Sequence, residues 1–158
     1  MSPGPRIVFT RFPTGDSSRL APWTAHLDQV VAGVGPAAAV DSGDGVIVWQ
    51  LVSANNRHLA RSVAIHGSFT DATANARDVI ESSSGLSVEL VSQPTRGSYG
   101  WYALDGDTPV MLCARWYLTP RDRRHSIALA LRSLDEAELH PGVRLVPRTE
   151  GVPEPLPV

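Results

Sequence analysis

Apolar residues are concentrated in short stretches that have the length and composition of β-strands. Asn55 and Asn56 separate two of these stretches, and Asp105 and Gly106 separate another two. Asn and Gly accept the positive φ angles that a tight hairpin turn requires, so both pairs predict antiparallel hairpins. The predicted strands cover residues 6–10, 46–53, 59–65, 86–92, 99–104, 110–118 and 142–146.

Three other stretches have apolar residues at the three- and four-residue spacing of an amphipathic helix. The first helix is predicted over residues 22–34, where the Gly-Pro pair at 35–36 ends it. The second covers residues 71–81, with Ser68 or Thr70 as its N-cap. The third begins after Thr119 as N-cap, with Pro120 at the first helical position, where its missing N–H is harmless.

The order strand, turn, strand, helix occurs twice along the chain. Trp49 and Trp101 lie near the start of the first hairpin strand in each copy, and the second strand contains Ala-Arg, at 60–61 and at 114–115. We therefore predict an α+β fold with two tandem antiparallel meander-plus-helix repeats, at residues 37–85 and 86–146. A strand-helix segment at residues 1–36 precedes them. Residues 147–158, which hold four prolines, are predicted to be a flexible tail.

The repeated segments also resemble a known family. The residues that carry the likeness are 49–56 (WQLVSANN) and 60–62 (ARS) in the first copy, and 88–91 (VELV) and 99–104 (YGWYAL) in the second. In these residues the chain resembles the YegP-like family of small bacterial proteins, which have one or two units of a three-strand meander followed by a helix. The family pattern has Asn-Gly in the hairpin, whereas this chain has Asn55-Asn56 and Asp105-Gly106. The resemblance implies a fold and no activity, because the family has no settled biochemical function.

Composition excludes several classes of protein and site. A hydrophobic content of 42% with 19% charged residues is typical of a globular domain, and a net charge of −2 gives no overall attraction to nucleic acid or to an anionic membrane. All 14 basic residues are arginine, which indicates GC-rich codon usage and a bacterial source. The N-terminus has no apolar signal core, and no apolar run approaches the roughly 20 residues of a membrane span, so we expect a cytoplasmic protein without a membrane partner.

Catalytic and cofactor signatures are weak. Cys113 is the single cysteine and lies in an apolar strand, where a buried, inert thiol is the usual outcome. The five histidines have none of the spacings of a helical metal site, and residues 41–45 lack the ligand positions of a calcium loop. The glycines form no phosphate-binding loop. We therefore expect no catalytic residue, no metal site and no cofactor.

The densest cluster of charge lies at the start of the third helix. Arg121, Arg123, Arg124 and His125, with Arg115 nearby in sequence, are candidates for binding an anion or a nucleic acid, because guanidinium groups and helical N–H groups suit phosphate. Trp101, Tyr102, Trp116 and Tyr117 are candidate stacking surfaces beside them, with core packing as the alternative. A solvated helix face is the alternative interpretation of the arginines.

The sequence thus favours a non-enzymatic protein-interaction module. A meander leaves the backbone groups of its edge strands open to strand addition, and the partner is unknown, with a second copy of the chain as one candidate. The alternative is a nucleic-acid or anion-binding protein that uses the arginine cluster.

Overall fold

A computed structural model describes residues 4–13, 17–31 and 45–145 of the chain. In chain order the elements are β1 (Arg6–Phe12), α1 (Ser17–Val30), β2 (Val46–Val52), β3 (His58–Ser62), α2 (Phe69–Glu81), η1 (Ser83–Gly85), β4 (Ser87–Gln93), η2 (Pro94–Arg96), β5 (Ser98–Asp105), β6 (Thr108–Cys113), α3 (Pro120–Glu136) and β7 (Glu138–Leu145). The α+β class predicted from the sequence is confirmed. The predicted tail, residues 147–158, lies outside the described residues.

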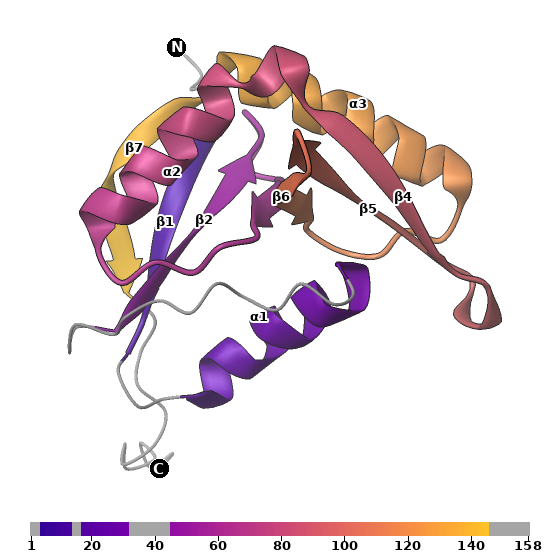
Figure 1. Ribbon diagram of the computed structural model, residues 1–158, viewed down its shortest axis with the longest axis horizontal. Helices are drawn as coiled ribbons and strands as arrows, with labels where there is room; N and C mark the ends of the chain where they lie inside the picture. The colour runs from indigo at the N-terminus through magenta and orange to yellow at the C-terminus, as the bar shows by residue number, and fades with distance from the viewer. Residues whose placement is uncertain (1–3, 14–16, 32–44, 146–158) are drawn as a thin grey trace.

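The strands form one seven-stranded sheet in the order β4-β5-β6-β3-β2-β1-β7. All neighbours are antiparallel except β1 and β7, which run parallel. Figure 1 shows α2 and α3 side by side on one face of the sheet and α1 on the other. The helices therefore cover both faces at the centre, and the sheet keeps two outer strands, β4 and β7.

Corresponding residues of the two halves make corresponding contacts. The backbone N–H of Trp49 donates to Ser62 Oγ at 3.2 Å, and that of Trp101 donates to Cys113 Sγ at 3.4 Å. The indole of Trp49 donates to Asn75 Oδ1 on α2 at 2.8 Å, and the indole of Trp101 donates to Ser126 Oγ on α3 at 3.1 Å. Each tryptophan is fully buried and ties its own sheet strand to the helix that covers it.

The helix starts correspond as well. Ser68 Oγ accepts the N–H of Asp71 at the start of α2, and Thr119 Oγ1 accepts the N–H of Asp122 at the start of α3. These are the N-caps expected from the sequence, since a hydroxyl satisfies one of the free N–H groups of the first turn. Asn56, in the predicted hairpin turn, has the positive φ of 67° that such a turn requires.

Several element boundaries differ from the sequence prediction. Helix α1 was expected to begin at Pro22 but begins at Ser17, because Leu20 and Trp23 extend its apolar side onto Phe12 and Val48. The strands expected over 59–65 and 110–118 end earlier, at Ser62 and Cys113. In both halves the regular ladder ends there, and one isolated bridge back to the sheet, His66 with Ile47 and Tyr117 with Tyr99, precedes the N-cap of the following helix.

The N-terminal segment is joined to the first hairpin by pairing. The boundary expected near residue 36 lies outside the described residues, but β1 pairs with β2 along its whole length, from Arg6 with Val52 to Phe12 with Val46. The last strand, expected over 142–146, begins earlier, at Glu138, and extends the sheet beyond β1. Segments from both ends of the chain therefore lie side by side at one edge of the sheet (Figure 1).

Candidate functional site

Strand β4 is an unprotected edge of the sheet. It pairs with β5 residue for residue from Ser87 to Gln93 without a register shift, and its other side has no neighbouring strand in the described part of the chain. Its sequence contains no proline and one charged residue, Glu89. Leu90, at its centre, is 58% exposed. A regular edge strand with an exposed leucine and little charge is a template for another strand.

The hydrogen bonding of β5 shows which backbone groups of β4 are free. Tyr99 of β5 exchanges two backbone hydrogen bonds with Tyr117, on the side away from β4. In an antiparallel ladder successive residues direct their N–H and C=O groups to opposite sides, so Gly100 faces β4 and its partner Val91 faces β5. The alternate residues, Val88, Leu90 and Ser92, therefore direct their backbone groups outward.

The opposite edge, β7, is irregular. Its register with β1 shifts between Ile7 and Phe9, which pair with Leu139 and Val143, so that residues 140–142 form a bulge. This bulge contains a proline and a glycine, and the Gly142 N–H donates to His140 Nδ1 at 3.2 Å. Bulges and proline discourage the addition of a further strand, so the two edges of the sheet are not equivalent.

The arginine cluster predicted from the sequence does not converge on one place. Arg121, Arg124 and His125 lie exposed on the outer side of α3, as in the alternative of a solvated helix face. Arg123 lies on another side of the same helix, where it donates to Val91 O at 3.1 Å and to Ser92 Oγ at 3.2 Å, with its guanidinium 5.3 Å from the Tyr99 ring centre. Arg123 therefore holds α3 against β4 and β5.

The fifth predicted residue, Arg115, lies in the segment between β6 and α3. Its guanidinium is 5.4 Å from the centre of the Tyr117 ring. Arg115 and His125 both line a cavity of about 600 Å³, which Asp122 also lines. Of the predicted stacking residues, Trp101 is in the core, whereas Tyr102, Trp116 and Tyr117 are half-buried. The structure brings Arg115 and His125 to one cavity and leaves Arg121 and Arg124 outside it.

Cys113 is fully buried, as expected of a packing residue. Burial raises the pKa of its thiol to about 11, so the nucleophilic thiolate is scarce at neutral pH. The carbonyl of Cys113 accepts a hydrogen bond from His26 Nε2 at 2.9 Å. Burial is also the main cause that lowers the pKa of His26. In the described part of the chain, no three His, Cys, Asp or Glu side chains gather as metal ligands.

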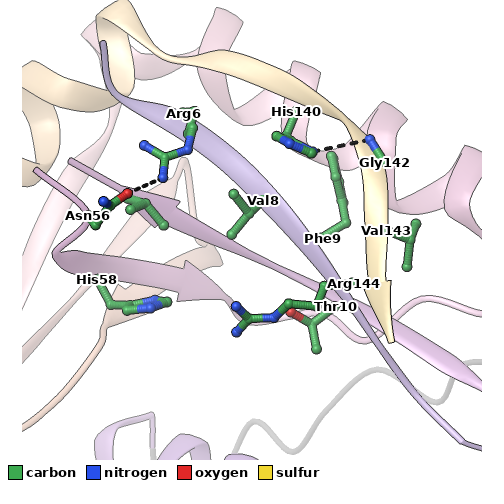
Figure 2. A pocket seen from close by; sticks show the side chains of 11 residues that line it. Arg6, Val8, Phe9, Thr10, Asn56, His58, His140, Gly142, Val143 and Arg144 are labelled. Carbon is green, nitrogen blue, oxygen red and sulfur yellow. Dashed lines mark hydrogen bonds between the residues drawn. The ribbon is translucent and has the colours of Figure 1, made fainter. Parts of the chain in front are cut away.

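A site that the sequence analysis missed lies over β1 and the strands beside it, β7 on one side and β2 and β3 on the other. A cavity of about 410 Å³ is lined by Arg6 and Thr10 of β1, His58 of β3 and Arg144 of β7, among others. Figure 2 shows Arg6, His58 and Arg144 on the same side of β1, with the Arg144 guanidinium directed toward His58. The alternation of β1 places Arg6, Val8 and Thr10 on one face, a signal visible in the sequence, but Arg144 is far away along the chain.

The charges of this cavity are all of one sign. None of its lining residues is acidic. The pKa of His58 is lowered by burial first and then by the positive charges of Arg144 and Arg6. Arg6 is held in place by hydrogen bonds to the side-chain oxygen of Asn56 and to Ser53 O, the latter at 3.4 Å. The arrangement supplies fixed hydrogen-bond donors and positive charge to whatever occupies the cavity.

Comparison with known proteins finds one solved structure. The solution NMR structure of YegP, a protein of unknown function from E. coli, is similar to this chain, with 18% sequence identity and a TM-score of 0.48. The similarity covers 72% of this chain and 96% of the YegP chain. YegP gives its name to the family that the chain resembles in sequence. No protein-family model and no curated protein matches the chain.

Among the helices in the described ranges, none is long and apolar enough to cross a bilayer.

Proposed function

We propose that this chain is a non-enzymatic protein-interaction module that binds its partner by strand addition at β4, and that the partner is a second copy of the chain. The observation that carries the proposal is the regular, proline-free edge of β4 with Leu90 exposed at its centre. Strand addition satisfies backbone groups that otherwise bond water, and the side chains of the added strand provide selectivity.

Self-pairing about a two-fold axis at Leu90 suits this strand. An antiparallel arrangement centred on Leu90 places Val88 opposite the partner's Ser92, and each outward-facing residue then exchanges backbone hydrogen bonds with its partner. The two copies of Leu90 lie directly opposite each other, which covers their exposed surface. Glu89 faces the partner's Val91, so the only charged residue of β4 does not meet its own copy.

The experiment measures mass against concentration by sedimentation velocity. The wild-type weight-average mass should rise from 17.0 kDa toward twice this value as the protein is concentrated. Leu90→Pro should keep the protein at the monomer mass, because it removes an outward N–H while leaving the bonds between β4 and β5 intact. Leu145→Ser is the matched control, since Leu145 is 64% exposed on the opposite edge.

Two outcomes would overturn this proposal. A wild-type chain that stays at the monomer mass at millimolar concentration has no self-association of the proposed kind. A dimer that survives in Leu90→Pro, with circular dichroism showing a native fold, forms through another surface.

The buried thiol supports two lesser points of the same proposal. An inert Cys113 and scattered histidines favour a binding role over catalysis, and a lone reduced cysteine suits the cytoplasm.

The composition of the basic residues, all arginine, supports a bacterial source. We also infer that the two halves arose by tandem duplication, because the Trp49 and Trp101 contacts correspond in both partner strand and partner helix.

A further inference from the structure

The cavity over β1, β2, β3 and β7 combines features that a chance surface depression lacks. The guanidinium groups of Arg6 and Arg144 and the ring of His58 lie around it with no carboxylate among its lining residues. Like charges repel at short range, and none of the residues that line the cavity is acidic to offset this repulsion. A bound anion would offset this repulsion, because it is attracted to both guanidinium groups.

The backbone around the cavity is shaped to leave it open. The bulge of β7 at residues 140–142 stands opposite Val8, and Gly142 and His140 of this bulge line the cavity. A regular strand would continue the ladder at this point. Bulges next to functional sites commonly redirect side chains, and here the strand resumes at Val143 with Arg144 beside Thr10.

We propose that this cavity binds a small phosphate monoester, with its phosphate oxygens on Arg6 and Arg144. A phosphate dianion matches two guanidinium groups in charge, and its three terminal oxygens accept the forked donors of arginine better than the two oxygens of a carboxylate. Asn56 and Thr10 add uncharged polar groups to the same wall. This site is separate from the β4 edge, which lies at the other end of the sheet.

The size of the cavity indicates more than a free phosphate ion. A volume of about 410 Å³ is within the range of pockets that hold small organic ligands. The remaining wall includes the apolar side chains of Val8 and Val52. The phosphate would therefore bind at the arginines, and the organic part of the ligand would lie against the valines.

His58 reports on occupancy. Arg6 and Arg144 disfavour its protonated form, and His140 adds a further titratable group from β7. A phosphate dianion reverses the sign of the local field, so its binding should raise the pKa of His58. By linkage, the same ligand should bind more tightly when His58 is protonated.

The test is an NMR titration of the full chain at constant ionic strength, with methyl phosphate as the probe and acetate as the carboxylate arm. Methyl phosphate should shift the His58 ring resonances in a saturable manner and raise the pKa of His58. Acetate should bind at least about tenfold more weakly, since it offers fewer oxygens and less charge. Equal affinity for the two probes would overturn the assignment to phosphate.

Two variants of equal net charge locate the site. Arg6→Gln/Arg144→Gln should weaken methyl phosphate binding by about a hundredfold, from about tenfold for each charged hydrogen-bonding group. Arg121→Gln/Arg124→Gln removes the same charge from the exposed side of α3 and should bind like the wild type. The reverse pattern would overturn the proposal in favour of the α3 arginines. An absence of saturable shifts in the wild type would also overturn it.

Arg6 bonds Asn56 and Ser53 O, so its loss has a structural effect that must be separated from binding. The single variant Arg144→Gln avoids those bonds and should retain the wild-type melting temperature while losing about tenfold in affinity. An unchanged affinity for methyl phosphate in a folded Arg144→Gln protein would show that Arg144 does not bind the phosphate.

Discussion

Arg61 is a buried cation with no carboxylate partner among the residues that the structure describes, and its replacement tests what holds α1 to the sheet. Its side chain is 7% exposed in β3. The guanidinium carbon lies 4.0 Å from the centre of the Trp23 ring, and Nη2 donates to Trp23 O at 3.2 Å. The Nε atom is buried and has no hydrogen-bond partner. We predict that Arg61→Met changes the free energy of unfolding by no more than about 1 kcal/mol, because two opposing effects are lost together.

The magnitudes follow from the contacts of the guanidinium. Burial lowers the pKa of Arg61 from its usual value to about 10. At about 1.4 kcal/mol per pH unit, this difference costs the charged folded state roughly 3 kcal/mol. The cost is fully present at pH 7, below both the folded and the unfolded pKa, and would disappear only as the pH rises through this range. Against it stand a desolvated cation–π contact of about 2 kcal/mol and one charged hydrogen bond of about 1.5 kcal/mol.

A methionine at position 61 keeps much of the volume and a sulfur contact with Trp23 while removing the charge. Arg61→Ala is the matched variant, because it also removes the charge but leaves a cavity. We expect it to be at least about 2 kcal/mol less stable than Arg61→Met. The measurement is equilibrium unfolding in urea at pH 7, followed by tryptophan fluorescence.

The comparison between the two variants shows whether the charge or the packing of the Arg61 side chain stabilises the fold. If Arg61→Met loses more than about 3 kcal/mol, or unfolds together with Arg61→Ala, the charge itself stabilises the fold, and its desolvation does not offset its contacts with Trp23. Equal slopes of the unfolding curves are needed, because a changed slope would show that the unfolded ensemble has moved as well.

A substitution at Gly100 and a fall in pH should each destabilise the fold. Gly100→Ala should destabilise the protein by about 1–3 kcal/mol, since the new Cβ would lie 2.9 Å from Trp116 Cζ3. The substitution should also alter Trp116 fluorescence. If the variant melts at the wild-type temperature, the Trp116 ring moves freely. Acid should also destabilise the fold, because burial lowers the pKa of His26 and of His66, so the unfolded chain takes up protons first. The stability contributed by the neutral histidines should be fully present above about pH 6.5 and be lost as the pH falls through their lowered pKa values in the folded state. His26→Gln should reduce this loss. A melting temperature that does not change between pH 7 and 5 would contradict this pH dependence.

Local sequence signals were sufficient for much of the secondary structure. The hydroxyl of Thr119 caps α3 with Pro120 in its first turn, and Asn56 adopts the positive φ of its turn, as their side chains predict. Both features depend on contacts within a few residues, so the sequence contains all the information needed. The repeated order of strand, turn, strand and helix was visible as well, because each element has its own local signal. The contacts from Trp49 to Asn75 and from Trp101 to Ser126 were not visible, because they join residues 26 and 25 positions apart.

The arginine cluster shows where local reasoning fails. Residues 121–125 are adjacent in sequence, but a helix turns about 100° per residue and sends neighbouring side chains to different sides. Arg123 consequently reaches Val91 and Ser92 in the edge strand β4, while Arg121 and Arg124 remain in solvent. The proximity of charges along the chain therefore did not predict their proximity in space.

The sequence by itself determined where most strands and helices form, because hydrophobic period, caps and turn residues act over one or two turns of chain. Only the tertiary structure decided that β7 returns to pair in parallel with β1, which brings Arg144 beside Thr10 and toward His58. It also decided which edge is open, since β4 lies at the end of the sheet order and β7 bulges. The order of the strands and the contacts between distant side chains depend on long-range strand pairing. The local pattern does not determine this pairing, because the same strands could pair in several orders.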